Sequence, residues 1–288
     1  MGIAEQSTTT VAAGLAREGK LPVLSTYGVF CSQRNADQMR TTVCYSNLNV
    51  FFAGAHGGIS VGADGATHQS LEEISVVGIL PNMNLEVPCD CLETERATKY
   101  LLFKIKGPKY IRFAREATPT VTTRKTPYVF GKANVVRFRQ ETDRFIDAFE
   151  TVLGSKYKSE GEAVTIISCG PELTEAMRAA YILKQEFKVE TRVINLHTIK
   201  PLDKETIIQA AKETRLIITA EEHQRGGLGN LVAGVILEAN LEKAPKFDMI
   251  GINDRFGESG SSWELVKFFG LTAEHIAGRV IKSLKRVS

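Results

Sequence analysis

Short apolar runs alternate with helix-like segments along most of the chain, and this alternation constrains the fold more than any other feature. In the first part of the chain, strand-like and helix-like stretches follow one another at 21–27, 36–44, 49–55, 69–79, 94–105 and 109–115. Strands that alternate with helices form β-α units, and such units build parallel sheets. The sequence therefore predicts an α/β fold.

The pattern stops near residue 116 and resumes near residue 162. The intervening segment is polar, charged and proline-containing, which is typical of a linker, and one interpretation of its charged part at 142–152 is a helix. Beyond it we expect strands at 163–170, 191–196, 215–220 and 247–252, and helices at 172–186, 228–239, 263–269 and 273–286. We therefore predict two parallel-sheet-rich α/β domains, at 1–116 and 162–288, joined by an extended linker at 117–161.

Composition excludes several classes of protein. The 288 residues carry a net charge of +3, which is too small to indicate a nucleic-acid or membrane partner, and no run of 18 apolar residues is present. The five cysteines are odd in number, which favours a reducing cytoplasm over a disulfide framework. The close pair Cys89 and Cys91 lacks a second cysteine pair or a nearby histidine, so we predict no metal site in this chain.

Glu5 is the first candidate for chemistry, because it lies among small and apolar residues in the segment MGIAEQ. Poor solvation would raise the pKa of its carboxyl group, and a protonated carboxyl can donate a hydrogen bond to a ring nitrogen. The alternative is an acidic residue at the start of a helix near Thr8–Thr10, stabilised by the helix dipole. Both interpretations are open at this point.

A glycine-rich loop at 55–69 is the second candidate. It follows a predicted strand and holds His56, Asp64, His68 and four glycines. Glycine allows close approach of the backbone to a ligand, and ligand sites in parallel sheets lie beyond the carboxyl ends of the strands. We therefore favour a binding site here over a long surface loop with solvated histidines.

Two arginines end the predicted strand at 109–115. Arg112 stands between Ile111 and Phe113, and Arg115 follows after Ala114, a placement that suits the binding of a phosphate or carboxylate. One of the two is expected to be a structural ion-pair partner instead. In the second domain Asp203 is expected to cap a helix, and no nucleophile–base pair is evident, so packing and assembly roles are favoured there.

These segments together resemble the transketolase family of thiamine-diphosphate enzymes. The resemblance covers nearly the whole chain and rests on four segments in order: GIAEQ at 2–6, YGVFCSQRNADQ at 27–38, HGGISVGADGATHQ at 56–69 and TIKPLD at 198–203. It implies a pyrimidine-binding domain followed by a transketolase C-terminal domain. The implied activity is transfer of a two-carbon ketol unit between sugar phosphates.

The resemblance also implies residue roles. Glu5 resembles the catalytic glutamate that donates a hydrogen bond to the N1′ atom of the cofactor's aminopyrimidine, and Phe30 the residue that stacks on that ring. Arg34 lies in the same segment and is included in the cofactor site. His56 looks like the loop histidine that acts near the reacting carbonyl and hydroxyl of the sugar.

The remaining implied roles concern the substrate. Asp64 resembles the aspartate that binds a substrate hydroxyl, His68 resembles the second loop histidine, and Arg115 resembles the arginine that holds the acceptor phosphate. Gln33 and Ala36 stand where some relatives have aromatic residues, so the ring site is expected to be less aromatic.

Part of the family's machinery is missing from this sequence. Relatives have a strand and a helix before the glutamate segment, so we expect an N-terminally truncated pyrimidine-binding domain. The thiamine diphosphate and Mg²⁺ of relatives are held by a domain with a GDG motif, whereas here Ala63-Asp64-Gly65 lacks the first glycine. The expected partner is therefore an N-terminal transketolase domain or subunit, with a homodimer through the pyrimidine domains or a heterotetramer.

Other functions fit parts of the same pattern. Deoxyxylulose-phosphate synthase and the E1 β-subunit of 2-oxoacid dehydrogenases share the glutamate and the overall fold, but His56 and the GADGATHQ segment favour transketolase. A non-catalytic assembly subunit is the third alternative. It is disfavoured because Glu5, His56 and Arg115 are all present.

Overall fold

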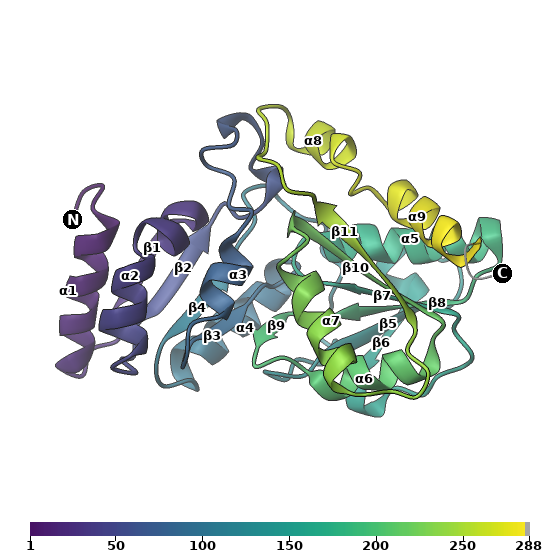
Figure 1. Ribbon diagram of the computed structural model, residues 1–288, viewed down its shortest axis with the longest axis horizontal. Coiled ribbons are helices and arrows are strands. Elements are labelled where there is room, and N and C mark those ends of the chain that lie inside the picture. The colour runs from purple at the N-terminus through teal and green to yellow at the C-terminus, as the bar shows by residue number, and fades with distance from the viewer. Residues whose placement is uncertain (286–288) are drawn as a thin grey trace.

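Two mostly parallel sheets lie at the centre of the computed structural model, which describes residues 1–285, so Arg286 at the end of the last predicted helix lies outside the described residues. The first sheet has the strand order β1 (Val23–Tyr27), β2 (Phe51–Ala55), β4 (Lys109–Arg112), β3 (Asn84–Glu86), β9 (Thr198–Lys200). The second has the order β11 (Lys246–Ile252), β10 (Leu216–Gln224), β7 (Val164–Ser168), β8 (Thr191–Asn195), β5 (Asn134–Phe138), β6 (Phe149–Leu153). Figure 1 shows the two sheets side by side with helices packed on them. The predicted α/β fold is confirmed.

Helices connect and cover the strands of both sheets. The first part of the chain contains α1 (Glu5–Arg17), α2 (Ala36–Gln38), α3 (Glu73–Gly78) and α4 (Cys91–Phe103). The second part contains α5 (Glu172–Phe187), α6 (Lys204–Glu213), α7 (Leu228–Glu238), α8 (Ser262–Phe268) and α9 (Ala273–Lys285). Two π-helical turns, Phe30–Arg34 and Met39–Cys44, flank α2, so the helix predicted at 36–44 is only partly α-helical.

Fully buried apolar side chains explain why the strands form where they do. Phe52 and Tyr110 stack in the first sheet with ring centroids 6.5 Å apart, and Ile166 and Ile218 are completely buried in the second. A strand covered on both faces is apolar along its whole length, which is why these runs were visible in the sequence. Asp203 caps α6 as predicted, since its carboxylate accepts a hydrogen bond from Thr206 N at 3.3 Å.

The helix interpretation of 142–152 is wrong. This segment forms a short 3₁₀ turn at Phe145–Ala148 and then β6, which pairs antiparallel with β5 along its whole length. The rings of Phe138 and Phe149 meet across the pair at 5.5 Å, so cross-strand packing outweighs local helical preference. Both strands lie within the expected linker and extend the second sheet. The division of the chain into domains at 1–116 and 162–288 with a linker at 117–161 stays a prediction.

The two halves of the chain also share a sheet. β9 comes from the C-terminal half but pairs antiparallel with β3 at the edge of the first sheet. A strand of three residues carries too little periodicity to be found in the sequence. Separately, Glu222 of β10 lies against the loop that follows β2, where it accepts a hydrogen bond from Ser60 N.

Candidate active site

The seven residues to which the family resemblance gives a role lie in one region, at the carboxyl ends of β1, β2 and β4. His56 follows β2 directly, Phe30 follows β1, and Arg115 follows β4. These strands are neighbours and parallel, so their carboxyl ends lie at the same edge of the sheet. The others are Glu5 at the start of α1, Arg34, Asp64 and His68.

Arg34 contacts both Glu5 and Phe30. Its guanidinium lies 3.1 Å from a carboxylate oxygen of Glu5, and its central carbon lies 4.2 Å from the centre of the Phe30 ring. The side chain of Glu5 is only 8% exposed, whereas that of Arg34 is 45% exposed. A flat cation therefore covers the aromatic ring and pairs with the buried carboxylate.

One of the two interpretations of Glu5 required a raised pKa, and the structure favours the other. Burial alone would raise this pKa, but the backbone N–H at the start of α1 and the Arg34 guanidinium together lower it below its ordinary value. Glu5 is thus the acidic first residue of a helix, as the alternative interpretation held. Its carboxyl group is ionised at neutral pH.

Tyr27 links the two loop histidines and was missed in the sequence. Its ring stacks on that of His56 at 4.3 Å and meets that of His68 edge-on at 5.4 Å. His68 also meets Phe30 edge-on at 5.3 Å. Its position as an aromatic residue at the carboxyl end of β1 could have marked Tyr27 as a site residue. The four rings form one continuous wall.

Asp64 and Arg115 form the second polar group of the site. The Arg115 guanidinium donates to Asp64 Oδ1 at 2.9 Å and to the carbonyl of Val61 at 2.8 Å. The hydroxyl of Tyr27 donates to the other carboxylate oxygen of Asp64 at 3.3 Å. The Arg115 side chain is 34% exposed, so it can reach a dissolved anion.

His56 has the properties of a neutral hydrogen-bonding group. Its backbone has φ of +59°, and its buried Nδ1 has no hydrogen-bond partner among the described residues. Burial and the nearby Arg115 lower its pKa, which outweighs the opposite effect of Asp64. A strained residue with an unsatisfied polar atom is typical of a functional position.

Arg112 is the structural member of the two arginines, as expected. It is 2% exposed and donates to Glu73 at 2.9 Å, and Tyr110 donates to the same carboxylate. On its other side lies Glu222 of the second domain, 3.8 Å away. Glu73 and Glu222 were not singled out in the sequence, because their burial depends on packing between distant segments.

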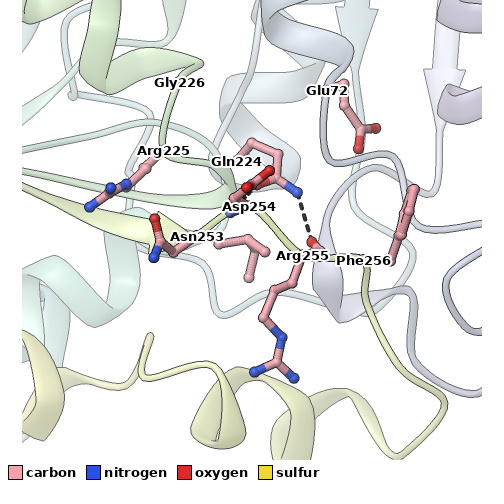
Figure 2. Close-up of a pocket in the computed structure, with 9 residues that line it drawn as sticks. Glu72, Gln224, Arg225, Gly226, Asn253, Asp254, Arg255 and Phe256 are labelled. Atoms are coloured by element: carbon pink, nitrogen blue, oxygen red, sulfur yellow. Dashed lines mark hydrogen bonds between the residues drawn. The ribbon is translucent and has the colours of Figure 1, made fainter.

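A separate pocket of about 500 Å³ is lined by Glu72 and by residues 224–226 and 252–256. Figure 2 shows its lining residues, which include Glu72, Arg225, Asn253 and Arg255; Gln224 donates to the carbonyl of Arg255 at 2.8 Å. The seven site residues do not line it.

Across residues 1–285 no group of three or more histidine, cysteine or acidic side chains is arranged to hold a metal ion. No helix in that range has the length and apolarity to cross a membrane.

Family models match both parts of the chain. The transketolase pyrimidine binding domain matches residues 1–120, and the transketolase C-terminal domain matches residues 154–276. A solved structure described as a split gene transketolase, inactive beta4 tetramer, has a TM-score of 0.82 at 35% identity, and the match covers 99% of this chain and 83% of that chain.

Curated relatives agree with these matches. A protein described as a transketolase C-terminal section from Methanocaldococcus jannaschii is 36% identical over 99% of this chain and 82% of its own length. A subunit of the apulose-4-phosphate transketolase from Phocaeicola vulgatus is 35% identical over 99% of this chain and 83% of its own length. This chain belongs to the transketolase family.

Proposed function

We propose that this chain is the C-terminal part of a transketolase that transfers a two-carbon ketol unit between sugar phosphates. The observation that supports it best is the convergence of seven side chains from separate segments on one edge of the first sheet. They combine a buried carboxylate, an aromatic wall, a neutral histidine and an accessible arginine. Family membership supports a dependence on thiamine diphosphate.

The residues of the chain fit the aminopyrimidine ring of that cofactor. A planar, hydrogen-bond-donating group already occupies the space between Phe30 and Glu5, namely the guanidinium of Arg34. The ring is also planar and would meet the same aromatic face and the same carboxyl group. We propose Glu5, Phe30 and Arg34 as the cofactor-binding residues. Thiamine diphosphate, when bound, supplies the carbanion chemistry that breaks and forms the carbon–carbon bond.

The protein's own groups would orient and protect the reacting sugar. Glu5 would hold a proton at its carboxyl group and donate it as a hydrogen bond to the ring edge. The neutral His56, whose pKa is lowered by burial and by Arg115, would exchange a proton with a carbonyl or hydroxyl of the sugar. Tyr27, Phe30 and the two loop histidines would exclude water from one side.

Asp64, His68 and Arg115 would bind the rest of the substrate. A carboxylate accepts hydrogen bonds from sugar hydroxyls, and a guanidinium can bind a phosphate through two parallel hydrogen bonds. Asp64 and Arg115 already lie 2.9 Å apart, so a hydroxyl and a phosphate of one sugar chain could be bound side by side. We propose sugar phosphates as the substrates on this basis.

A partner is part of the proposal. We propose that a separate N-terminal domain or subunit with a GDG motif holds the diphosphate and Mg²⁺, and that pyrimidine domains pair in a homodimer or heterotetramer. The relative from Phocaeicola vulgatus is named as one subunit of its enzyme, and the split gene structure is described as inactive, which supports the need for a second polypeptide. A cytoplasmic location is proposed from the cysteine content.

The test is reconstitution. The chain is mixed with its N-terminal partner, thiamine diphosphate and Mg²⁺, and turnover of xylulose 5-phosphate with ribose 5-phosphate is measured. We expect turnover, and we expect Glu5→Gln to abolish it. Consumption of pyruvate without ketol transfer would instead indicate deoxyxylulose-phosphate synthase or a 2-oxoacid dehydrogenase. Full activity of Glu5→Gln would remove Glu5 from the mechanism.

A further inference from the structure

One buried carboxylate of the second domain touches the backbone of the substrate loop. Glu222 lies near the end of β10, is 3% exposed and accepts a hydrogen bond from Ser60 N at 3.2 Å. Ser60 stands between His56 and Asp64 in sequence, in the 3₁₀ turn Ile59–Asp64. The contact therefore joins two domains at the centre of the loop that carries three of the site residues.

The loop is shaped to receive this carboxylate. Gly58 has φ of +91°, and a side chain there would place its Cβ 2.4 Å from the carboxyl carbon of Glu222. The glycine thus supplies both the backbone conformation and the space for the carboxylate. On its other side Glu222 faces the guanidinium of Arg112 at 3.8 Å, which is itself fixed by Glu73. The carboxylate of Glu222 thus has one hydrogen bond, from Ser60 N, and one ion-pair partner, Arg112.

Further contacts from the second domain hold the end of the same loop. Gln69 donates to the carbonyl of Glu258 at 2.9 Å, and Gln224 N donates to the carbonyl of Leu71 at 2.8 Å. These contacts fix residues 69–71. At the middle of the loop, residues 259–262 pack near Gly62 and Gly65, while Glu222 accepts a hydrogen bond from the loop backbone. The side chain of Glu222 does not belong to the wall formed by Tyr27, Phe30 and the histidines.

We propose that Glu222 is a positioning residue, which acts through the backbone at Ser60 to hold His56, Asp64 and His68 in place for the substrate. The effect of Glu222 on substrate binding rests on the proposed function. Its effect on the loop structure does not. It gives the second domain a role in the reaction beyond packing and assembly. Glu222 touches neither substrate nor cofactor in this role.

Hydrogen exchange of the intact chain tests the structural part. In Glu222→Met the acceptor for Ser60 N–H is lost, so we expect amides of the peptide 56–70 to exchange on the order of tenfold faster. Glu222→Gln keeps an oxygen acceptor and should restore slow exchange. Glu258→Gln is the matched control, because its backbone carbonyl contacts the loop while its side chain pairs with Arg255. Unchanged exchange in Glu222→Met, or an equal increase across the whole chain, would overturn the proposal.

Kinetics of the reconstituted enzyme test the functional part. Displaced binding residues raise KM, whereas a smaller folded fraction lowers kcat alone. We expect Glu222→Met to raise KM for the sugar phosphate on the order of tenfold, Glu222→Gln to restore it, and Glu258→Gln to match the wild type. A fall in kcat with an unchanged KM, together with faster exchange over the whole chain, would indicate loss of folded protein and contradict a positioning role. Failure of the wild type to transfer a ketol unit would refute the proposed function. Hydrogen exchange would still show whether Glu222 holds the loop 56–70 in place.

Discussion

The guanidinium of Arg34 lies 4.2 Å from the centre of the Phe30 ring. The same group pairs with Glu5 at 3.1 Å and helps to keep that carboxylate ionised. The proposed role of Glu5 requires a protonated carboxyl group instead. Cofactor binding must therefore change both the partner and the protonation state of Glu5.

Proton uptake should accompany cofactor binding. Because the pKa of free Glu5 is lowered, its carboxyl group is ionised at pH 7, and formation of a hydrogen bond from it to the ring takes up about one proton per site. Calorimetric titration of the reconstituted complex with thiamine diphosphate, in buffers of different ionisation enthalpy, measures this number. Glu5→Gln cannot take up that proton and should show about one fewer per site. Identical uptake by both proteins would mean that Glu5 stays ionised when the cofactor is bound.

The pKa of His56 should respond to Arg115. Burial and the Arg115 charge lower this pKa, so His56 should titrate below the ordinary histidine value. In Arg115→Met one of the two lowering influences is lost, and the pKa should rise. NMR titration of histidine-labelled chain measures it, with the His56 signal assigned from a His56→Gln variant. Arg124→Met serves as a control for loss of a positive charge elsewhere, and an unchanged His56 pKa in Arg115→Met would contradict the contact.

The apolar strands and the identity of the site residues could be predicted from the sequence. β7, β8 and α5 lie almost where expected, because a buried parallel strand is apolar throughout and α5 has an acidic first turn. The glycine-rich loop was recognisable because it follows β2 directly. These features depend on residues that are close together in the chain.

The features that were missed depend on distant residues. The ionised state of Glu5 depends on Arg34, which is 29 positions away. The positioning contact joins Ser60 to Glu222 across 162 positions. β6 looked helical because its partner β5 was not recognised, and the pairing of the two strands decides the structure there. No local pattern carries this information.

The space around Gly58 gives a test that does not depend on activity. Gly58 and Gly161 have nearly the same backbone conformation, with φ of +91° and +89°, but nothing lies within 4 Å of a Cβ at Gly161. Gly161→Ala should lower the free energy of unfolding by about 1 kcal/mol through backbone strain alone. Gly58→Ala should lower it by about 2 kcal/mol more, because its Cβ overlaps the Glu222 carboxylate. Urea denaturation of both variants measures the difference, and equal losses would show that the carboxylate does not occupy this position.

Glu221 should make the stability of the chain depend on pH near neutrality. Its buried carboxylate accepts from the N–H groups of Leu228 and Gly229 at the start of α7, at 2.7 and 2.9 Å. Burial raises its pKa from 4.5 to about 7, an effect that these hydrogen bonds only partly offset. Between these two values the folded chain holds more protons than the unfolded chain, so the free energy of unfolding falls as pH rises.

Glu221→Gln isolates this contribution, because glutamine does not titrate while the other buried acids remain in both proteins. The wild type should lose on the order of 3 kcal/mol of stability relative to the variant between about pH 4.5 and about pH 7. Urea denaturation at closely spaced pH values measures both curves. Curves that stay parallel across this range would mean that Glu221 is already ionised at the acidic end, held in that state by the two N–H groups of α7.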